Sequence, residues 1–195
     1  MITAKLINHM GKDDTPAWSA WVSTGKDELP RTEEQVVNLI ERLAKDKHFG
    51  CFEHNTASFE IECPIFIARQ IMRHRTFSYN ELSGRYKDFS DRDIYLSPEL
   101  GPLDKKMIEG FNKRIRIMYI NLRNSGYSKE VARLVLPLST MTKFKMTGNL
   151  RNWAHFINLR LDPHAQEEVR IIARQVKEEL ETLWPVSTKN LLQNQ

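Results

Sequence analysis

The sequence predicts one domain of mixed α and β structure, residues 1–195, in which helices dominate. The chain has the length of a single domain that can bury a sizeable core. Alternation of apolar and polar residues marks strands, whereas apolar residues at helical spacing mark longer segments. There is no internal repeat and no linker that would divide the sequence, so the whole chain is expected to fold as one unit.

The first half begins with signals for a strand and two helices. Residues 5–10 are expected to form the first strand, and Pro16 opens a short helix that is capped by Asp14 or Thr15. Thr32–Gln35 is a capping box, the clearest helix start in the sequence. The apolar face of the helix that follows carries Val36, Leu39, Ile40 and Leu43.

A second strand and a third helix follow. Residues 54–63 alternate between apolar and polar side chains, as a half-exposed strand does. Pro64 stops this strand and opens a helix that is expected to run over 64–75. Residues 76–86 have no helical period and are expected to form a loop, with Gly84 at a turn. The side of the strand that is expected to face the core carries Asn55, Ala57, Phe59, Ile61 and Cys63.

The second half of the chain is expected to contain mostly helices. The first of them is long and amphipathic, with its Lys and Arg side chains pointing outward. In order, we expect a helix over 103–122, a short helix between Ser128 and Pro137, a strand over 140–149, a helix over 150–160, and a final helix capped by Asp162–Pro163 that ends at Pro185.

Charge and cysteine content narrow the classes of function. The formal net charge of +4 is a modest basic bias, which favours an anionic ligand without separating nucleic acid from nucleotide. No apolar run approaches the ~20 residues of a membrane helix, and the N-terminus lacks the layout of a signal peptide. A cytoplasmic protein without a membrane partner is therefore expected. Cys51 and Cys63 are expected to be reduced.

A metal centre is one alternative for the function. His48, Cys51, Glu53 and His54 lie close together in the sequence and could bind zinc in a metal enzyme. However, their spacing matches neither a His-Glu-x-x-His motif nor a pair of cysteines, so no metal is expected.

The segment 69–86, RQIMRHRTFSYNELSGRY, is rich in hydrogen-bond donors. It contains four arginines but only one acid, Glu81, so the guanidinium groups cannot all be paired within it. Their partners could lie elsewhere, for instance at Glu60 and Glu62 on the preceding strand. Because guanidinium groups bind phosphate and carboxylate through two points, we favour an anion site. Its residues would be Arg73, His74, Arg75 and Arg85.

A second polar cluster lies on the segment 149–160. Arg151 and His155 are four residues apart on one helical face, with Asn149 at the start of the helix and Arg160 at its end. A solvated helix face is the alternative interpretation. Arg133 stands in an otherwise apolar short helix, where a cation needs a specific partner.

A nucleic-acid-binding module is the other alternative. The sequence has no Gly-rich dinucleotide loop and no Walker loop, so a nucleotide site would have to be built from side chains. In a module for RNA or single-stranded DNA, the bases could stack on Trp18, Trp21, Tyr79 and Tyr86.

The segment 73–86, RHRTFSYNELSGRY, resembles the signature of the flavin-dependent thymidylate synthases, in which Arg-His-Arg is followed by seven residues and a serine. The motif with its flanks is long and specific, and the resemblance covers most of the chain. The further matching segments are FEH at 52–54, PIFIARQ at 64–70, EVARLVLP at 130–137, NLR at 149–151, HFINLR at 155–160 and HAQ at 164–166.

This resemblance implies a fold, a reaction and an assembly. The fold would be α+β, with a small twisted, antiparallel-rich sheet flanked by helices, and the active sites would lie between the subunits of a homotetramer. The reaction would be reductive methylation of dUMP to dTMP, with 5,10-methylenetetrahydrofolate as carbon donor and FAD, reduced by NADPH, as hydride source. No nucleic acid would take part, and no cysteine nucleophile would be needed because the flavin carries the difficult step.

The resemblance also implies residue roles. Arg160 matches the family's catalytic arginine and would stabilise negative charge on the uracil ring. One departure is that Gly50 and Cys51 stand where the family has Ser or Thr followed by Pro, so a hydroxyl group that would reach the flavin is missing. Flavin binding is implied for Ser23, His48, Gly50, Arg73, His74, Arg75, Glu81, Asn149, Leu150, Arg151 and His155. Binding of dUMP is implied for Gln70, Arg73, Glu81, Leu82, Ser83, Gly84, Arg85, Arg133 and Arg160.

Overall fold

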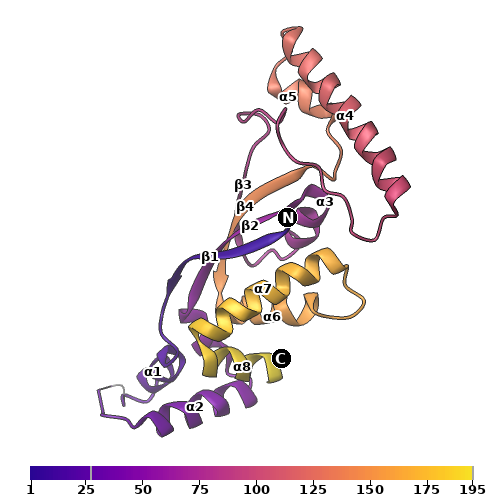
Figure 1. Cartoon of the computed structure of the whole chain (residues 1–195). Coiled ribbons are helices and arrows are strands. Elements are labelled where there is room, and N and C mark those ends of the chain that lie inside the picture. The colour runs from indigo at the N-terminus through magenta and orange to yellow at the C-terminus, as the bar shows by residue number, and fades with distance from the viewer. Residues whose placement is uncertain (27, 195) are drawn as a thin grey trace.

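The computed structural model describes residues 1–26 and 28–194, which form an elongated molecule built around one antiparallel sheet (Figure 1). The expected mixed fold, a small sheet flanked by helices, is confirmed. The strands are β1 (Thr3–Met10), β2 (Thr56–Pro64), β3 (Ser78–Glu81) and β4 (Met141–Asn149), in the order β1-β2-β4-β3. The helices are α1 (Thr15–Val22), α2 (Glu33–Lys45), α3 (Ile65–Ile71), α4 (Pro102–Asn124), α5 (Lys129–Ala132), α6 (Leu150–Arg160), α7 (Glu167–Leu183) and α8 (Pro185–Asn194), with 3-10 turns η1 (Phe49–His54) and η2 (Arg133–Val135).

The two faces of the sheet differ in polarity. On β2, the expected alternation is confirmed, since Phe59, Ile61 and Cys63 are fully buried while the residues between them are half-buried. This buried face packs against α6 and α7, and the ring of Phe59 meets that of Trp153 edge to face at 4.9 Å. The opposite face carries polar cross-strand pairs. The core therefore lies on one side of the sheet.

Helix α2 begins where the capping box predicts. The Thr32 side chain accepts a hydrogen bond from the backbone N–H of Gln35, and the Gln35 side chain accepts one from the backbone N–H of Thr32. The helix buries its apolar face against α8 and α1. None of the helices in the described residues is long and apolar enough to cross a membrane.

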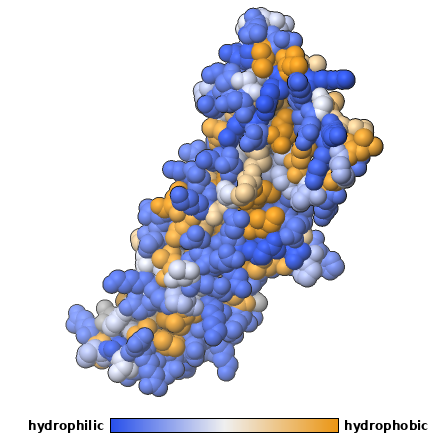
Figure 2. All heavy atoms as spheres, viewed as in Figure 1, coloured by the Kyte–Doolittle hydropathy of each residue, from blue (hydrophilic) through white to orange (hydrophobic). Residues whose placement is uncertain are grey.

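Helix α4 projects from one end of the molecule and leaves most of its apolar side chains exposed (Figures 1 and 2). Within this helix, which is described in full, only Asn112 and Tyr119 are buried. Arg116 joins α4 to the rest of the chain by donating to the backbone oxygen of Arg92 at 2.7 Å. The exposed apolar residues of α4 are Leu103, Met107, Phe111, Ile117, Met118 and Ile120.

The segment 64–86 differs from the sequence-based expectation. The helix ends at Ile71 instead of residue 75, because the backbone tightens and the N–H of His74 donates to the oxygen of Ile71 at 3.0 Å. The loop expected over 76–86 contains strand β3, which pairs with β4. The expectation of a continuous loop was wrong because a strand of four residues is too short to show a period.

The C-terminal helices also differ from those expected from the sequence. The final helix was expected to be capped by Asp162–Pro163, but α7 begins at Glu167, and the Asp162 carboxylate instead accepts from the backbone N–H of His164. Pro185 was expected to end the last helix. It opens a further helix, α8, as proline does at a first helical position.

Asp13 explains why α8 begins at Pro185. Its carboxylate accepts hydrogen bonds from the backbone N–H groups of Val186 and Ser187, both at 2.8 Å. The Ser187 hydroxyl in turn donates to the backbone oxygen of Asp13 at 2.8 Å. A helix N-terminus needs acceptors for its first N–H groups, and here they come from a residue far away in the sequence.

Replacing Asp13 with alanine is expected to lower the free energy of unfolding by about 1–2 kcal/mol, the usual cost of losing a helix N-cap. Urea unfolding followed by circular dichroism would measure the change. The matched control is Glu181→Ala, which removes an exposed carboxylate that pairs with Lys177 at 3.6 Å. This control is expected to change stability by less than about 0.5 kcal/mol, and equal losses in both variants would contradict the capping role of Asp13.

Candidate active site

The predicted site residues form two groups at opposite ends of β4. Asn149 ends this strand and lines a first cleft of about 630 Å³. Thr142 lies near its start and lines a second cleft of about 360 Å³. At about 3.3 Å per residue, the two positions lie roughly 23 Å apart. A single chain therefore does not gather all the predicted residues in one pocket.

The first cleft lies where η1 and the start of α6 meet. Asn149 caps α6, because its side chain accepts from the backbone N–H of Asn152 at 3.0 Å. On the same turn of helix, Arg151 forms an ion pair with Glu53 of η1. The cleft is lined by Lys47, Phe49, Glu53, Thr76, Asn149, Arg151, Asn152 and His155.

Lys47 reaches this cleft through an unusual backbone conformation. It follows α2 with a φ of 59°, in the left-handed region that rarely holds a residue other than glycine. The N–H of Lys47 donates to the oxygen of Ala44, and the N–H of His48 donates to that of Leu43. These two bonds form a Schellman motif, which ends the helix and directs the chain toward η1.

Beside the first cleft, His74 and Arg160 are in direct contact. Arg160, the last residue of α6, donates from Nε to Nε2 of His74 at 2.9 Å and from Nη2 to the backbone oxygen of Gln70 at 3.0 Å. The residue His74 is only 8% exposed, and its ring lies 6.1 Å from that of His155. The fold thus brings together four predicted site residues that come from α3, the turn after it and α6.

Burial sets the protonation state of this cluster. Desolvation, reinforced by the nearby charges of Arg160 and His155, lowers the pKa of His74 to about 4, so its imidazole is neutral at pH 7. Burial also lowers the pKa of Arg160 from its ordinary value and raises that of Tyr79 to about 12. The Tyr79 hydroxyl remains protonated and donates to the backbone oxygen of His74 at 2.9 Å.

The neutral state of His74 predicts a loss of stability in mild acid. The unfolded chain protonates this histidine near pH 6.5, whereas the folded chain does so near 4. The contribution of His74 is therefore complete above about pH 6.5 and is lost as the pH falls toward 4, by up to about 1.4 kcal/mol per pH unit. Urea midpoints measured at pH 7, 6 and 5 should fall more steeply in the wild type than in a His74→Phe variant. Equal slopes in the two proteins would contradict this assignment.

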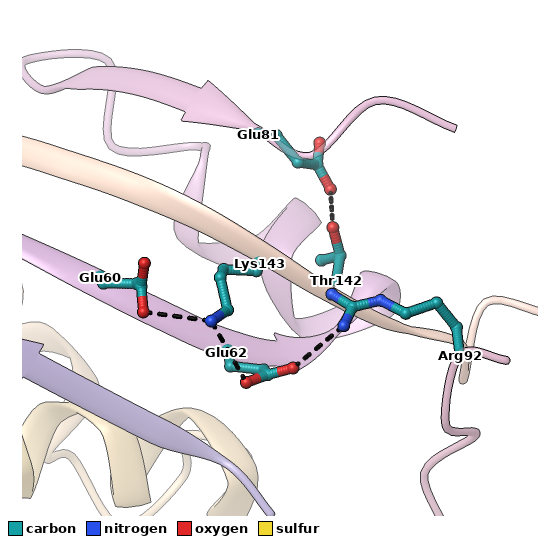
Figure 3. A network of polar contacts seen from close by, with 6 residues as sticks. All are labelled: Glu60, Glu62, Glu81, Arg92, Thr142 and Lys143. Carbon is teal, nitrogen blue, oxygen red and sulfur yellow. Dashed lines mark hydrogen bonds and ion pairs between the residues drawn. The ribbon is translucent and has the colours of Figure 1, made fainter. Parts of the chain in front are cut away.

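The second cleft lies at the end of β3. The Thr142 hydroxyl donates to the carboxylate of Glu81 at 2.7 Å (Figure 3). Gly84 is buried against Arg133, and an added Cβ would lie 3.2 Å from Cδ of that arginine, so the close approach favours glycine. The residues that line this cleft are Ile65, Glu81, Leu82, Ser83, Gly84, Phe89, Arg133, Leu136, Pro137, Leu138 and Thr142.

Glu60 and Glu62 do not pair with the arginines of the segment 69–86. Lys143 contacts Glu60 at 3.1 Å and Glu62 at 3.9 Å, and Arg92 contacts Glu62 at 3.4 Å (Figure 3). The two carboxylates are thus already engaged on the polar face of the sheet, and the pairing considered from the sequence was wrong.

Most arginines of the segment 69–86 keep their donors available. Arg85 pairs with Glu130 at 3.3 Å, across an exposed surface. Arg73 and Arg75, which flank His74, are exposed, and neither side chain forms a hydrogen bond or an ion pair with the described residues. Exposed guanidinium groups next to a cleft are typical of a site for an anion.

The other predicted site residues lie around the first cleft or away from it. His48 and Gly50 flank Phe49, which lines the cleft, and an added Cβ at Gly50 would meet nothing within 4 Å. A larger side chain would therefore fit at this departure from the family pattern. Leu150 is buried in the core. Ser23 follows α1 as its C-cap residue, where its hydroxyl donates to the backbone oxygen of Ala20 at 2.7 Å, and it lines neither cleft.

Several residues that line the two clefts were not predicted from the sequence, among them Lys47, Phe49, Thr142 and Asn152. Asn152 could have been found, because the asparagine three residues earlier, at the end of a strand, is a capping signal that places residue 152 in the first turn of the helix. Thr142 gave no signal, since its partner Glu81 lies on a strand that the sequence did not reveal.

The residues of the first cleft fit a flavin dinucleotide in chemical type. They combine cations and amide groups, which suit phosphate oxygens, with the aromatic ring of Phe49. By contrast, the described residues contain no group of three or more His, Cys, Asp or Glu side chains that could hold a metal ion. Of the four aromatic residues considered for base stacking, Tyr86 is exposed and the other three are partly buried.

Comparison with known proteins matches this architecture to one family. The family described as thymidylate synthase complementing protein matches residues 5–186. The chain is 39% identical to the flavin-dependent thymidylate synthase of Pseudothermotoga lettingae, over 93% of this chain and 86% of the relative. It is 34% identical to the enzyme of the same name from Thermus thermophilus, over 97% and 76%.

A solved structure agrees with the fold. The UMP/dUMP methylase PolB from Streptomyces cacaoi, bound with 5-Br dUMP, superposes with a TM-score of 0.85 at 29% identity, covering 97% of this chain and 94% of that chain. The form bound with 5-Br UMP gives a TM-score of 0.79 at 30% identity, covering 99% and 94%. The match over nearly the whole chain, together with relatives above 30% identity, shows that this protein belongs to the family of the flavin-dependent thymidylate synthases, which are enzymes.

Proposed function

We propose that residues 1–195 act as one enzyme domain that methylates dUMP to dTMP, with 5,10-methylenetetrahydrofolate as carbon donor and FAD, reduced by NADPH, as hydride source. The observation that carries this proposal is the contact between Arg160 and His74 beside a cleft of cations and amides. The flavin-dependent relatives support the cofactor, and the similarity to a methylase bound with 5-Br dUMP supports the substrate.

In this proposal, arginines and amides bind the phosphates. Arg73, Arg75, Asn149 and Arg151 would hold the flavin, which supplies the hydride when bound. Ser83, Gly84, Arg85 and Arg133 would hold the nucleotide, with the phosphate on the guanidinium groups. The other residues that the family resemblance assigns to the flavin or to dUMP would bind the same ligands.

Arg160 would act on the pyrimidine itself. A guanidinium group against the uracil ring stabilises the negative charge that develops there and so raises the nucleophilicity of the ring carbon. A thiolate is a poor candidate for this task in the present chain, because burial raises the pKa of Cys63 to about 12 and raises that of Cys51 as well.

The assembly would be a cytoplasmic homotetramer in which the second cleft of one copy faces the first cleft of another. Two observations support this part of the proposal. Ser83, Gly84 and Arg133, which are proposed for the nucleotide, line the second cleft, whereas Asn149 and Arg151, which are proposed for the flavin, line the first cleft at the opposite end of β4. The apolar side chains of α4 are exposed, as at an interface that another copy would cover.

An absorbance scan of the purified protein, with and without added FAD, gives the first test, and a flavin spectrum is expected. Oxidation of NADPH should then depend on both dUMP and methylenetetrahydrofolate, and mass spectrometry should detect dTMP. A colourless protein that takes up no added FAD would contradict the proposal. UMP is the matched alternative substrate: methylation of both nucleotides would match the substrates in the name of PolB, and product from UMP alone would contradict the proposal.

A further inference from the structure

We infer that His74 is a positioning residue for Arg160: its neutral ring nitrogen Nε2 holds the guanidinium plane in the orientation that the pyrimidine requires. This inference rests on the proposed function. It assigns His74 a role beyond contact with the flavin, because His74 would also orient Arg160. The task is defined by the hydrogen bond between the two side chains at 2.9 Å.

The direction of this bond fixes the state of the histidine. A guanidinium group can only donate, so Nε2 of His74 must be the acceptor and the ring proton must sit on Nδ1. The second contact of Arg160, from Nη2 to the backbone oxygen of Gln70 at 3.0 Å, uses a neighbouring nitrogen of the same planar group. Two contacts along one edge fix the orientation of the guanidinium plane and leave the Nη1 hydrogens for a ligand.

His74 is itself held on several sides, as a positioning group must be. Its backbone N–H donates to Ile71, and its backbone oxygen accepts from the Tyr79 hydroxyl at 2.9 Å. Its ring packs edge to face against Phe156 at 5.1 Å and Phe77 at 6.4 Å. Because Phe156 lies one turn before Arg160 on α6, the same packing fixes both partners relative to each other.

The alternative is that His74 merely fills space in the core or contacts only the flavin. Phenylalanine tests the first possibility, because the site is already lined by phenylalanine rings, and His74→Phe keeps an aromatic ring while removing both ring nitrogens. His74→Gln is the conservative partner, since its amide oxygen can accept from Arg160. His9→Phe serves as a control, because His9 is an exposed histidine on β1 whose ring contacts Trp184 at 6.3 Å.

Kinetics at saturating FAD and dUMP separate positioning from flavin affinity. His74→Phe is expected to lower kcat by about 10- to 100-fold, as for loss of a supporting hydrogen-bond partner. His74→Gln should recover most of this loss, and His9→Phe should match the wild type. A loss in His74→Phe that excess FAD fully restores would overturn the inference.

A double-mutant cycle tests the coupling directly. If His74 acts through Arg160, adding His74→Phe to Arg160→Ala should lower kcat by less than about 3-fold further, because the partner is already gone. The same 10- to 100-fold loss in both backgrounds would overturn the inference.

A measurement without turnover keeps this inference distinct from the proposed function. In nitrogen-15 spectra of the wild type, the Nε–H of Arg160 should exchange slowly with solvent, and His74→Phe should abolish that protection. Wild-type protein that shows this protection but makes no dTMP would refute the proposed function while confirming the contact. Absence of protection in an active wild-type enzyme would refute the positioning role.

Discussion

Replacing Arg160 with lysine is expected to lower kcat for dUMP methylation by about 10²- to 10³-fold, the usual effect of removing one donor that stabilises charge in the transition state. Lysine keeps the positive charge, but it cannot donate to His74 and to the oxygen of Gln70 from one planar group. The remaining charge would therefore be poorly placed against the pyrimidine. Steady-state kinetics at saturating FAD would measure the loss.

Arg170→Lys is the matched control for this experiment. Arg170 lies on α7, where it pairs with Glu167 at 3.0 Å, and it lines neither cleft. This variant is expected to retain the kcat of the wild type. Equal activity of Arg160→Lys and the wild type would show that the charge of residue 160, and not its planar geometry, is what the reaction uses.

Replacing Gly148 with alanine is expected to lower the free energy of unfolding by about 1–3 kcal/mol, as overpacking of a core does. A Cβ at Gly148 would lie 2.4 Å from Cδ1 and Cε1 of Phe77, well inside contact distance. The ring cannot move freely, because it packs against Trp153 at 4.6 Å. Since Phe77 lies three residues after His74, the displacement should also lower activity. Urea unfolding and kinetics on the same sample would measure both effects.

Gly110→Ala provides the control for Gly148→Ala. Gly110 lies within α4, and an added Cβ there meets nothing within 4 Å. Alanine should stabilise this helix position by about 0.5–1 kcal/mol. If Gly148→Ala is as stable as the wild type while Gly110→Ala behaves as expected, the contact between Gly148 and Phe77 cannot be as tight as described.

Local signals in the sequence predict much of the fold. The capping box at Thr32 and the alternation over β2 and β4 each mark an element through neighbouring residues, and the structure confirms all three. Elements that depend on distant partners were missed. Strand β3 is held by β4, and α8 is capped by Asp13, so neither leaves a readable local pattern.

The sequence suggests which residues form the candidate site, but it does not show how their side chains lie relative to one another. The family resemblance names most of the polar residues that line the two clefts, and it names Arg160 through the match at 155–160. It could not show that Arg160 binds His74, or that Glu81 lies at the opposite end of β4 from Asn149. These relations are set by strand register and by the length of α6, which only the folded chain defines.

The hydrogen bonds between Asp13 and α8 determine when this part of the chain can finish folding during synthesis on the ribosome. Val186 is made 173 residues after Asp13, so at about 5–20 residues per second its synthesis follows roughly 9 to 35 s later. During that interval β1 can already pair with β2, but the carboxylate of Asp13 has no helix to cap. Capping of α8 by Asp13 is therefore a late folding event, which follows the synthesis of residues 186 and 187.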